Sequence, residues 1–158
     1  MPKIDIDNVP AKTGSAYPGK MGAEMAGRSS LQLGDAGGLT QFGANLVKLA
    51  PGAKSSIIHW HTQQDEFLMV TEGELTLVED DGEALLRVGD CAAFPAGHAV
   101  GHQIVNRSNR AGAFLVVGTR TEHEVAYYTD RDMMMTSQNS NLEFTRKDGT
   151  PIDDGDSK

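Results

Sequence analysis

Cysteine and long hydrophobic runs are what this sequence most clearly lacks. The only cysteine is Cys91, so no disulfide bond can form within the chain, and the apolar run 91–94 predicts that this side chain is small and buried. No apolar run approaches the roughly 20 residues that cross a membrane as a helix. The first residues also lack the apolar segment of a secretory signal. We therefore predict a cytoplasmic protein that does not enter a membrane.

Positive charge is also scarce. The 14 lysine and arginine residues are outnumbered by 22 aspartate and glutamate residues, which gives a net charge of −8. Proteins bind nucleic acid mainly through cationic contacts with phosphate groups, and no helix-turn-helix pattern is evident. We therefore expect no nucleic-acid partner. The acidic runs 79–81 and 153–154 are typical of solvated turns and tails.

Glycine, by contrast, is abundant and divides the chain into short segments. Eighteen glycines separate short apolar or alternating runs, which favours tight turns between strands over long helices. No internal repeat is evident, and 158 residues are typical of one domain. We predict an all-β sandwich or small barrel. Its expected strands cover residues 29–33, 39–49, 55–61, 66–70, 74–78, 84–88, 91–94, 102–105 and 113–118, with 125–128 as a further candidate.

Four side chains in these segments form a candidate metal site. His59 and His61 are two residues apart, so a strand over 55–61 places both rings on one face. Glu66 follows after an odd step, and we expect the polar break 62–65 to turn the chain there. Glu66 then begins the adjacent antiparallel strand. His102 comes from a distant strand that has to lie beside the histidine pair.

This combination of ligands indicates one divalent transition metal ion, such as Mn, Fe, Ni or Zn, because three imidazoles and one carboxylate suit such ions. Four protein ligands leave positions open on an octahedral ion, which is typical of catalytic rather than structural sites. Any one of these histidines alone would more often be a hydrogen-bonded polar residue than a ligand. The spacing of the whole set, with glycine and proline around it, favours the metal site.

The two segments that carry these residues resemble the two motifs of the cupin superfamily, over about residues 40–118. The first motif is a glycine, His-x-His, a glutamate and a second glycine. The second is a glycine, Pro-x-Gly, a histidine and an asparagine. The matching residues are Gly52, His59, His61, Glu66, Gly73, Gly89, Pro95, Gly97, His102 and Asn106. The resemblance implies a cupin jelly-roll β-barrel (a double-stranded β-helix) over 39–119, an N-terminal arm and first strand over 1–38, and a C-terminal extension over 120–158.

Two spacings depart from the family pattern. The spacer before His59 is one residue longer than usual, and four residues rather than two separate Gly97 from His102. The longer second gap leaves His98 as an alternative third histidine ligand. We prefer His102, because its spacing to Asn106 is that of the family and it begins a strand, whereas His98 lies in a loop. Asn106 is expected to be a turn or capping residue rather than a ligand.

The resemblance also implies a function. The chain resembles metal-dependent cupin enzymes, which implies that it acts on a small oxygen-bearing substrate by dioxygenase, isomerase or lyase chemistry. Glu66 is the catalytic candidate, because a carboxylate that is displaced from the metal can transfer a proton. The alternative is a module that binds or senses a sugar or another metabolite without catalysis. A homodimer is implied as well, and we expect Trp60 to pack under the N-terminal arm or in the subunit interface.

Overall fold

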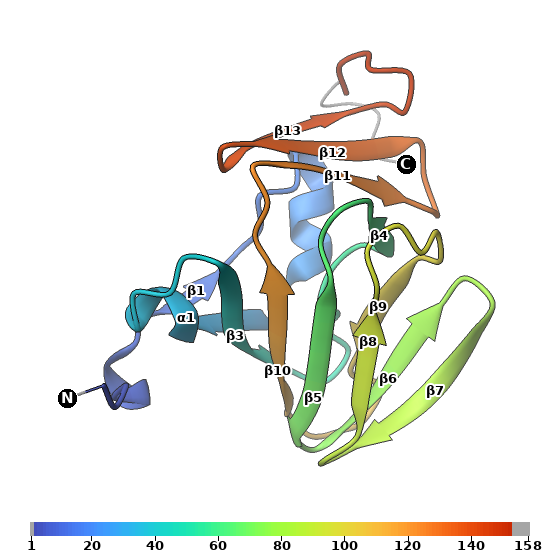
Figure 1. Ribbon diagram of the computed structural model, residues 1–158. Coiled ribbons are helices and arrows are strands. Elements are labelled where there is room, and N and C mark those ends of the chain that lie inside the picture. Colours follow the sequence, from blue (N-terminus) through green and yellow to red (C-terminus); the bar gives the residue numbers. More distant parts are fainter. Residues whose placement is uncertain (1, 153–158) are drawn as a thin grey trace.

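The computed structural model describes residues 2–152, which form two antiparallel β-sheets that face each other (Figure 1). The first sheet has six strands, in the spatial order β1 (Ala11–Thr13), β2 (Arg28–Gln32), β3 (Phe42–Leu49), β10 (Gly112–Thr119), β5 (Glu66–Glu72) and β8 (Cys91–Phe94). The second has seven, in the order β13 (Asn141–Thr145), β12 (Met133–Gln138), β11 (His123–Tyr128), β4 (His59–His61), β9 (His102–Val105), β6 (Glu74–Glu79) and β7 (Gly82–Arg87).

Helices contribute little to this architecture. The three helical segments are η1 (Ile6–Asn8), η2 (Gly19–Met25) and α1 (Leu33–Ala36). Within residues 2–152, no helix is long and apolar enough to cross a membrane.

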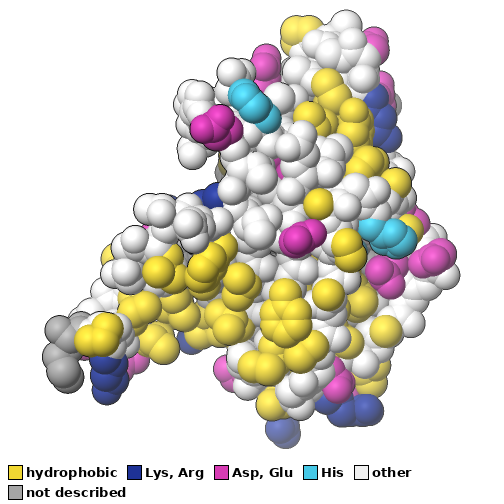
Figure 2. All heavy atoms as spheres, in the orientation of Figure 1, with side chains coloured by type: hydrophobic (Ala, Val, Ile, Leu, Met, Phe, Trp, Pro, Cys, Tyr) yellow, Lys and Arg dark blue, Asp and Glu magenta, His cyan; other side chains and the backbone are white. Residues whose placement is uncertain are grey.

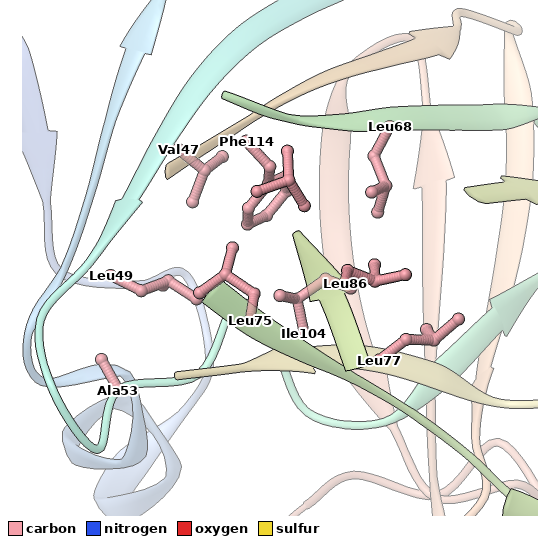
Figure 3. Packing of buried hydrophobic residues seen from close by; sticks show 10 residues of the cluster. Val47, Leu49, Ala53, Leu68, Leu75, Leu77, Leu86, Ile104 and Phe114 are labelled. Atoms are coloured by element: carbon pink, nitrogen blue, oxygen red, sulfur yellow. The ribbon is translucent and has the colours of Figure 1, made fainter. Parts of the chain in front are cut away.

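The main hydrophobic core lies between the two sheets. Its side chains point toward one another from both sheets (Figure 3), and Leu49 and Leu75 are fully buried. Burial of an aliphatic side chain of this size contributes roughly 1.5–3 kcal/mol. The larger members of the cluster are Val47, Leu49, Leu68, Val70, Leu75, Leu77, Leu86, Ile104 and Phe114. These residues come from six strands of the two sheets, so the core forms only when both sheets are in place.

A second, smaller cluster fixes the N-terminal segment to the body of the molecule. Met21 and Met25 of η2 pack with Ile57, Tyr128 and Met133, and all five are buried. The segment expected as an extended arm is therefore held by its own apolar contacts. Its strand β1 also pairs with β2, with Lys12 opposite Ser30.

Glycine turns join the strands of the barrel much as the sequence predicted. Gly73, between β5 and β6, has φ 71°, and Gly89, between β7 and β8, has φ 93°. Both values lie in the left-handed region that favours glycine. A Cβ atom at Gly73 would in addition lie 2.7 Å from the backbone oxygen of Ala111, so a larger residue there would force the turn to move.

Two predicted strand boundaries are wrong. The strand expected over 55–61 covers only His59–His61, because residues 55–58 form bends. The Ser55 hydroxyl there accepts a hydrogen bond from the Ile104 amide. The C-terminal extension, in which only 125–128 was a strand candidate, contributes three strands to the second sheet. The acidic pair 153–154 of the predicted tail lies outside the described residues.

The expected positions of two side chains have different outcomes. Cys91 is exposed, because β8 directs Ala92 and Phe94 toward the core and Cys91 and Ala93 outward. Trp60 packs against the Tyr127 ring of the adjacent strand β11, with ring centroids 5.1 Å apart, and its expected place in a subunit interface stays a prediction. A four-residue apolar run does not reveal which of its members face inward.

The outward face of the first sheet is also apolar. Figure 2 shows hydrophobic side chains gathered over β10, β5 and β8 and extending toward α1. Phe67 on β5 is 45% exposed, and Phe42 and Leu39 are exposed as well. An apolar surface of this kind on a β-sheet marks a place where the chain can bury area against another molecule.

Candidate metal centre

Three of the four predicted ligands form a compact cluster inside the barrel. One ligand atom each from His59, His61 and Glu66 all lie within 4.8 Å of one another. The two histidine Nε2 atoms are 3.1 Å apart, and His61 Nε2 is 3.4 Å from Glu66 Oε2. His102 joins the cluster through Glu66, because its Nε2 atom lies 2.9 Å from the same Oε2. The sequence pattern therefore identified side chains that do converge.

Strand pairing accounts for this convergence. His59 of β4 is directly opposite His102 of β9, and β9 also pairs with β6. The break at 62–65 turns the chain as expected, but the prediction that Glu66 begins the strand adjacent to the histidine pair is wrong, because Glu66 begins β5 in the opposite sheet. The corner at Gly97 is tied to the same place, because its amide donates to the His61 carbonyl oxygen over 2.9 Å. Both sheets thus deliver ligands to one point.

His98, the alternative ligand, does not join the cluster. Its side chain is exposed, and it lies in the loop between β8 and β9, where its amide donates to the Pro95 carbonyl oxygen. His102 is 6% exposed, and its ring stacks on Phe94 with centroids 3.7 Å apart and planes inclined by 4°. The longer loop after Gly97 therefore bulges outward and leaves His102 in the place that the family spacing indicates.

Asn106 has the structural role that the sequence suggested. It is fully buried, and its amide nitrogen donates to the carbonyl oxygens of Leu49 and Arg110. Its side-chain oxygen accepts from the Ser108 amide and hydroxyl. Asn106 thus closes the loop between β9 and β10 and holds it against β3.

The charge states of the cluster are set by burial and by the neighbouring groups. Burial lowers the pKa of His59 to about 4, and repulsion by His61 acts in the same direction, so this ring is neutral at pH 7. Burial also disfavours a charge on His61, but the Glu66 carboxylate outweighs it and raises the His61 pKa. Burial alone would raise the pKa of Glu66, yet hydrogen bonds from His102 and His61 hold it well below its usual range.

The donor set and its spacing fit a divalent transition metal. Ligands about 2.1 Å from one ion and at right angles to each other lie about 3.0 Å apart. The separations of 2.9, 3.1 and 3.4 Å within the cluster match this value. The Nδ1 atoms of His61 and His102 are buried without a hydrogen-bond partner in the described residues, so no second hydrogen bond orients either ring from that side.

Glu124 is a residue of the site that sequence reasoning missed. It is 1% exposed, and its carboxylate accepts hydrogen bonds from the Thr62 amide (2.8 Å), the Thr62 hydroxyl (2.9 Å) and the Gln63 amide (3.1 Å). These donors belong to the turn that separates His61 from Glu66. The available signal was an acidic residue in phase with the apolar positions Ala126 and Tyr128 of its strand.

The cluster opens into a cavity with a volume of about 750 Å³. His59, His61, Glu66 and His102 line one part of its wall, and Gln103 lies beside them. The Oε1 atom of Gln103 is buried and has no hydrogen-bond partner in residues 2–152. The predicted ligands are therefore accessible to a small molecule rather than sealed in the core.

Two facing antiparallel sheets that deliver three histidines and a glutamate to the inside of the barrel define a jelly-roll protein of the cupin class. A family model described as the cupin domain matches residues 45–118. The chain is 60% identical to a sugar phosphate isomerase of the cupin superfamily from Silicibacter pomeroyi, with 96% of each chain covered and a TM-score of 0.94. The chain therefore belongs to the cupin superfamily.

Two further solved structures are similar. A protein from Acidithiobacillus ferrooxidans, which carries the name sugar phosphate isomerase provisionally, is 28% identical over 79% of this chain and 80% of that one, with a TM-score of 0.72. The polyketide cyclase RemF from Streptomyces resistomycificus is 21% identical over 75% of this chain and 79% of that one, with a TM-score of 0.62, and supports the fold alone. No curated protein matches the sequence.

Proposed function

We propose that this protein is a metal-dependent isomerase of a small phosphorylated sugar. The observation that carries the proposal is the 60% identity, over 96% of both chains, to a cupin named as a sugar phosphate isomerase. The His/Glu cluster in the wall of a cavity of about 750 Å³ supports it, because the reaction needs both a polarising centre and room for the substrate.

The residues that would hold the metal are His59, His61, Glu66 and His102. Mn, Fe, Ni and Zn all accept such a ligand set, so they remain the candidate ions. When bound, a divalent ion supplies Lewis-acid polarisation of a substrate carbonyl and stabilises the negative charge that develops on its oxygen.

Glu66 is the proposed catalytic residue. The interconversion of an aldose and a ketose moves a proton between two neighbouring carbon atoms, and a carboxylate can accept it from one carbon and return it to the other. The Glu66 pKa lies well below its usual range, so the group is ionised at neutral pH. Its Oε2 atom contacts His102 and His61, whereas Oε1 has no hydrogen bond to any residue in 2–152.

The proposal is tested by incubating metal-reconstituted protein with phosphorylated aldoses and ketoses in D2O and following the products by NMR. We expect interconversion with deuterium appearing beside the carbonyl carbon. Glu66→Gln should lower turnover by about 10²–10⁴-fold, whereas Glu122→Gln, an exposed carboxylate on the loop before β11, should leave it unchanged. A rate that differs between air and argon would point to oxygenase chemistry instead. No turnover combined with tight sugar binding would favour the alternative of a binding or sensing module.

A further inference from the structure

The cavity wall differs in charge from the rest of the molecule. The whole chain has a net charge of −8, yet among residues 2–152 Glu66 of the histidine cluster is the only carboxylate in the cavity wall. Lys12 and Arg28 are the only lysine and arginine that the described residues contribute to that wall. Away from the cluster, the cavity of an acidic protein is therefore basic.

Strand register explains why these two cations face the same space. Arg28, Ser30 and Gln32 alternate along β2 and so project from one face of the first sheet. Lys12 of β1 is directly opposite Ser30, which makes it the diagonal neighbour of Arg28. Diagonal neighbours of this kind are about 7–8 Å apart, a distance that two long side chains can close.

Arg28 has no compensating charge. Within residues 2–152, no carboxylate lies within ion-pair distance of its guanidinium, and its Nε atom is buried without a hydrogen-bond partner. Glu24, four residues earlier in the chain, is paired with Lys54 and Arg131 instead. Burial lowers the pKa of Arg28, which means that its charge is poorly solvated where it stands.

Polar donors complete the surroundings of this cation. Ser30 and Gln32 follow it on the same face of β2, Asn45 of β3 is directly opposite Gln32, and all three residues line the cavity. Toward the histidine cluster the same inner face becomes apolar, with Val47, Phe114 and Leu68 between the two polar ends. The cavity thus has an anion-attracting end and a His/Glu end, separated by an apolar floor.

We propose that Arg28, with Lys12, binds the phosphate group of the substrate, while Ser30, Gln32 and Asn45 donate further hydrogen bonds to it. The inference rests on the proposed function, in that it assigns the phosphorylated end of the same substrate. A phosphate monoester carries up to two negative charges and several acceptor oxygens, which matches two cations and neutral donors. The fork of the guanidinium suits two of those oxygens at once.

The test is phosphate binding to protein from which metal has been removed by chelation, measured by isothermal titration calorimetry with inorganic phosphate. The titration is run at a pH of about 8, and a low salt concentration limits screening. We expect Arg28→Gln to weaken binding at least about tenfold, the loss of one charge-assisted contact. Arg28→Lys should have a smaller effect.

Lys48→Gln is the matched control. Lys48 is exposed and opposite Ser29, so the substitution removes one positive charge from the outward side of the same sheet. It should leave phosphate affinity within about twofold of the wild-type value. If Arg28→Gln does not fold, Arg28→Lys and Lys12→Gln take its place, because each retains a long side chain at the substituted position.

The possible outcomes separate the two proposals. Wild-type protein that does not bind phosphate, or Arg28 and Lys12 variants that bind it as well as wild type does, would overturn the phosphate site. The proposed reaction would still stand if deuterium exchange occurs equally with unphosphorylated sugars. Arg28-dependent phosphate binding without any turnover would support the site and overturn the isomerase. With turnover present, Arg28→Gln should raise KM for the phosphorylated substrate more than it lowers kcat.

Discussion

Replacement of Glu124 should disturb both the stability of the fold and the metal centre, although this residue is not a ligand. Glu124→Ala removes the acceptor for the backbone amides of Thr62, Gln63 and Val125. Each buried donor left unpaired costs about 1–3 kcal/mol, and water that enters the small cavity will recover part of this. We expect a loss of about 3–5 kcal/mol, a large share of the roughly 5–15 kcal/mol that stabilise a typical domain.

Urea and thermal unfolding followed by fluorescence provide the assay, because the only tryptophan, Trp60, lies between His59 and His61. For a chain of this size a loss of this magnitude lowers Tm by roughly 6–20 °C. The released turn should also weaken metal binding by about 10–100-fold, the usual effect of removing a group that orients ligands. Glu124→Gln keeps one acceptor oxygen, so its Tm and its metal affinity should lie between those of the wild type and of Glu124→Ala.

The control is Glu122→Ala, which removes an exposed carboxylate two residues away and should change stability by no more than about 0.5 kcal/mol. If Glu124→Ala matches this control in Tm and in metal content, the turn does not depend on Glu124 and the explanation given for the position of Glu66 is wrong.

Three further predictions concern the ligands, the pH dependence and the assembly. His102→Ala should abolish or strongly weaken metal uptake measured by elemental analysis, and His98→Ala should not; the reverse pattern would make His98 the ligand. Metal affinity should fall at least tenfold per pH unit as the pH drops below the raised pKa of His61, because the ion then has to displace a proton from that ring. His59 binds a competing proton only near its pKa of about 4. Metal occupancy that is unchanged at pH 4 would exclude imidazole ligation. The predicted homodimer should appear by light scattering, and Phe67→Lys on the apolar outward face should yield monomers if that face is the interface; an unchanged mass would place the contact elsewhere.

The strands of the barrel were largely predictable from the sequence, because glycine turns and period-two alternation are local signals. The segment after residue 120 was not, since Met133–Gln138 carries polar residues at half of its positions and its pairing with β11 and β13 is only seen in three dimensions. The early bends at 55–58 were missed for a similar reason. A Ser55 hydroxyl that caps an amide of β9 depends on a contact across 49 residues.

The site was predictable in its members but not in its assembly. The spacing of His59, His61 and Glu66 indicated one cluster, and family resemblance was needed to choose His102 over His98. The opposition of His59 and His102 is a property of register between distant strands, which no local pattern specifies. Arg28 and Lys12 belonged to a segment without clear periodicity, so nothing in the sequence linked them to the histidines.

The position of the phosphate-facing residues relative to the family match has an evolutionary consequence. The cupin model matches residues 45–118, which contain all four predicted metal ligands, whereas Lys12 and Arg28 precede it. The candidate metal ligands and the two cations of the proposed phosphate site are thus encoded in separate stretches of the gene, and Asn45 is the one member of that site inside the match. If both proposals hold, a change confined to the first 32 codons would alter the charge of the phosphate site and leave the four candidate metal ligands intact.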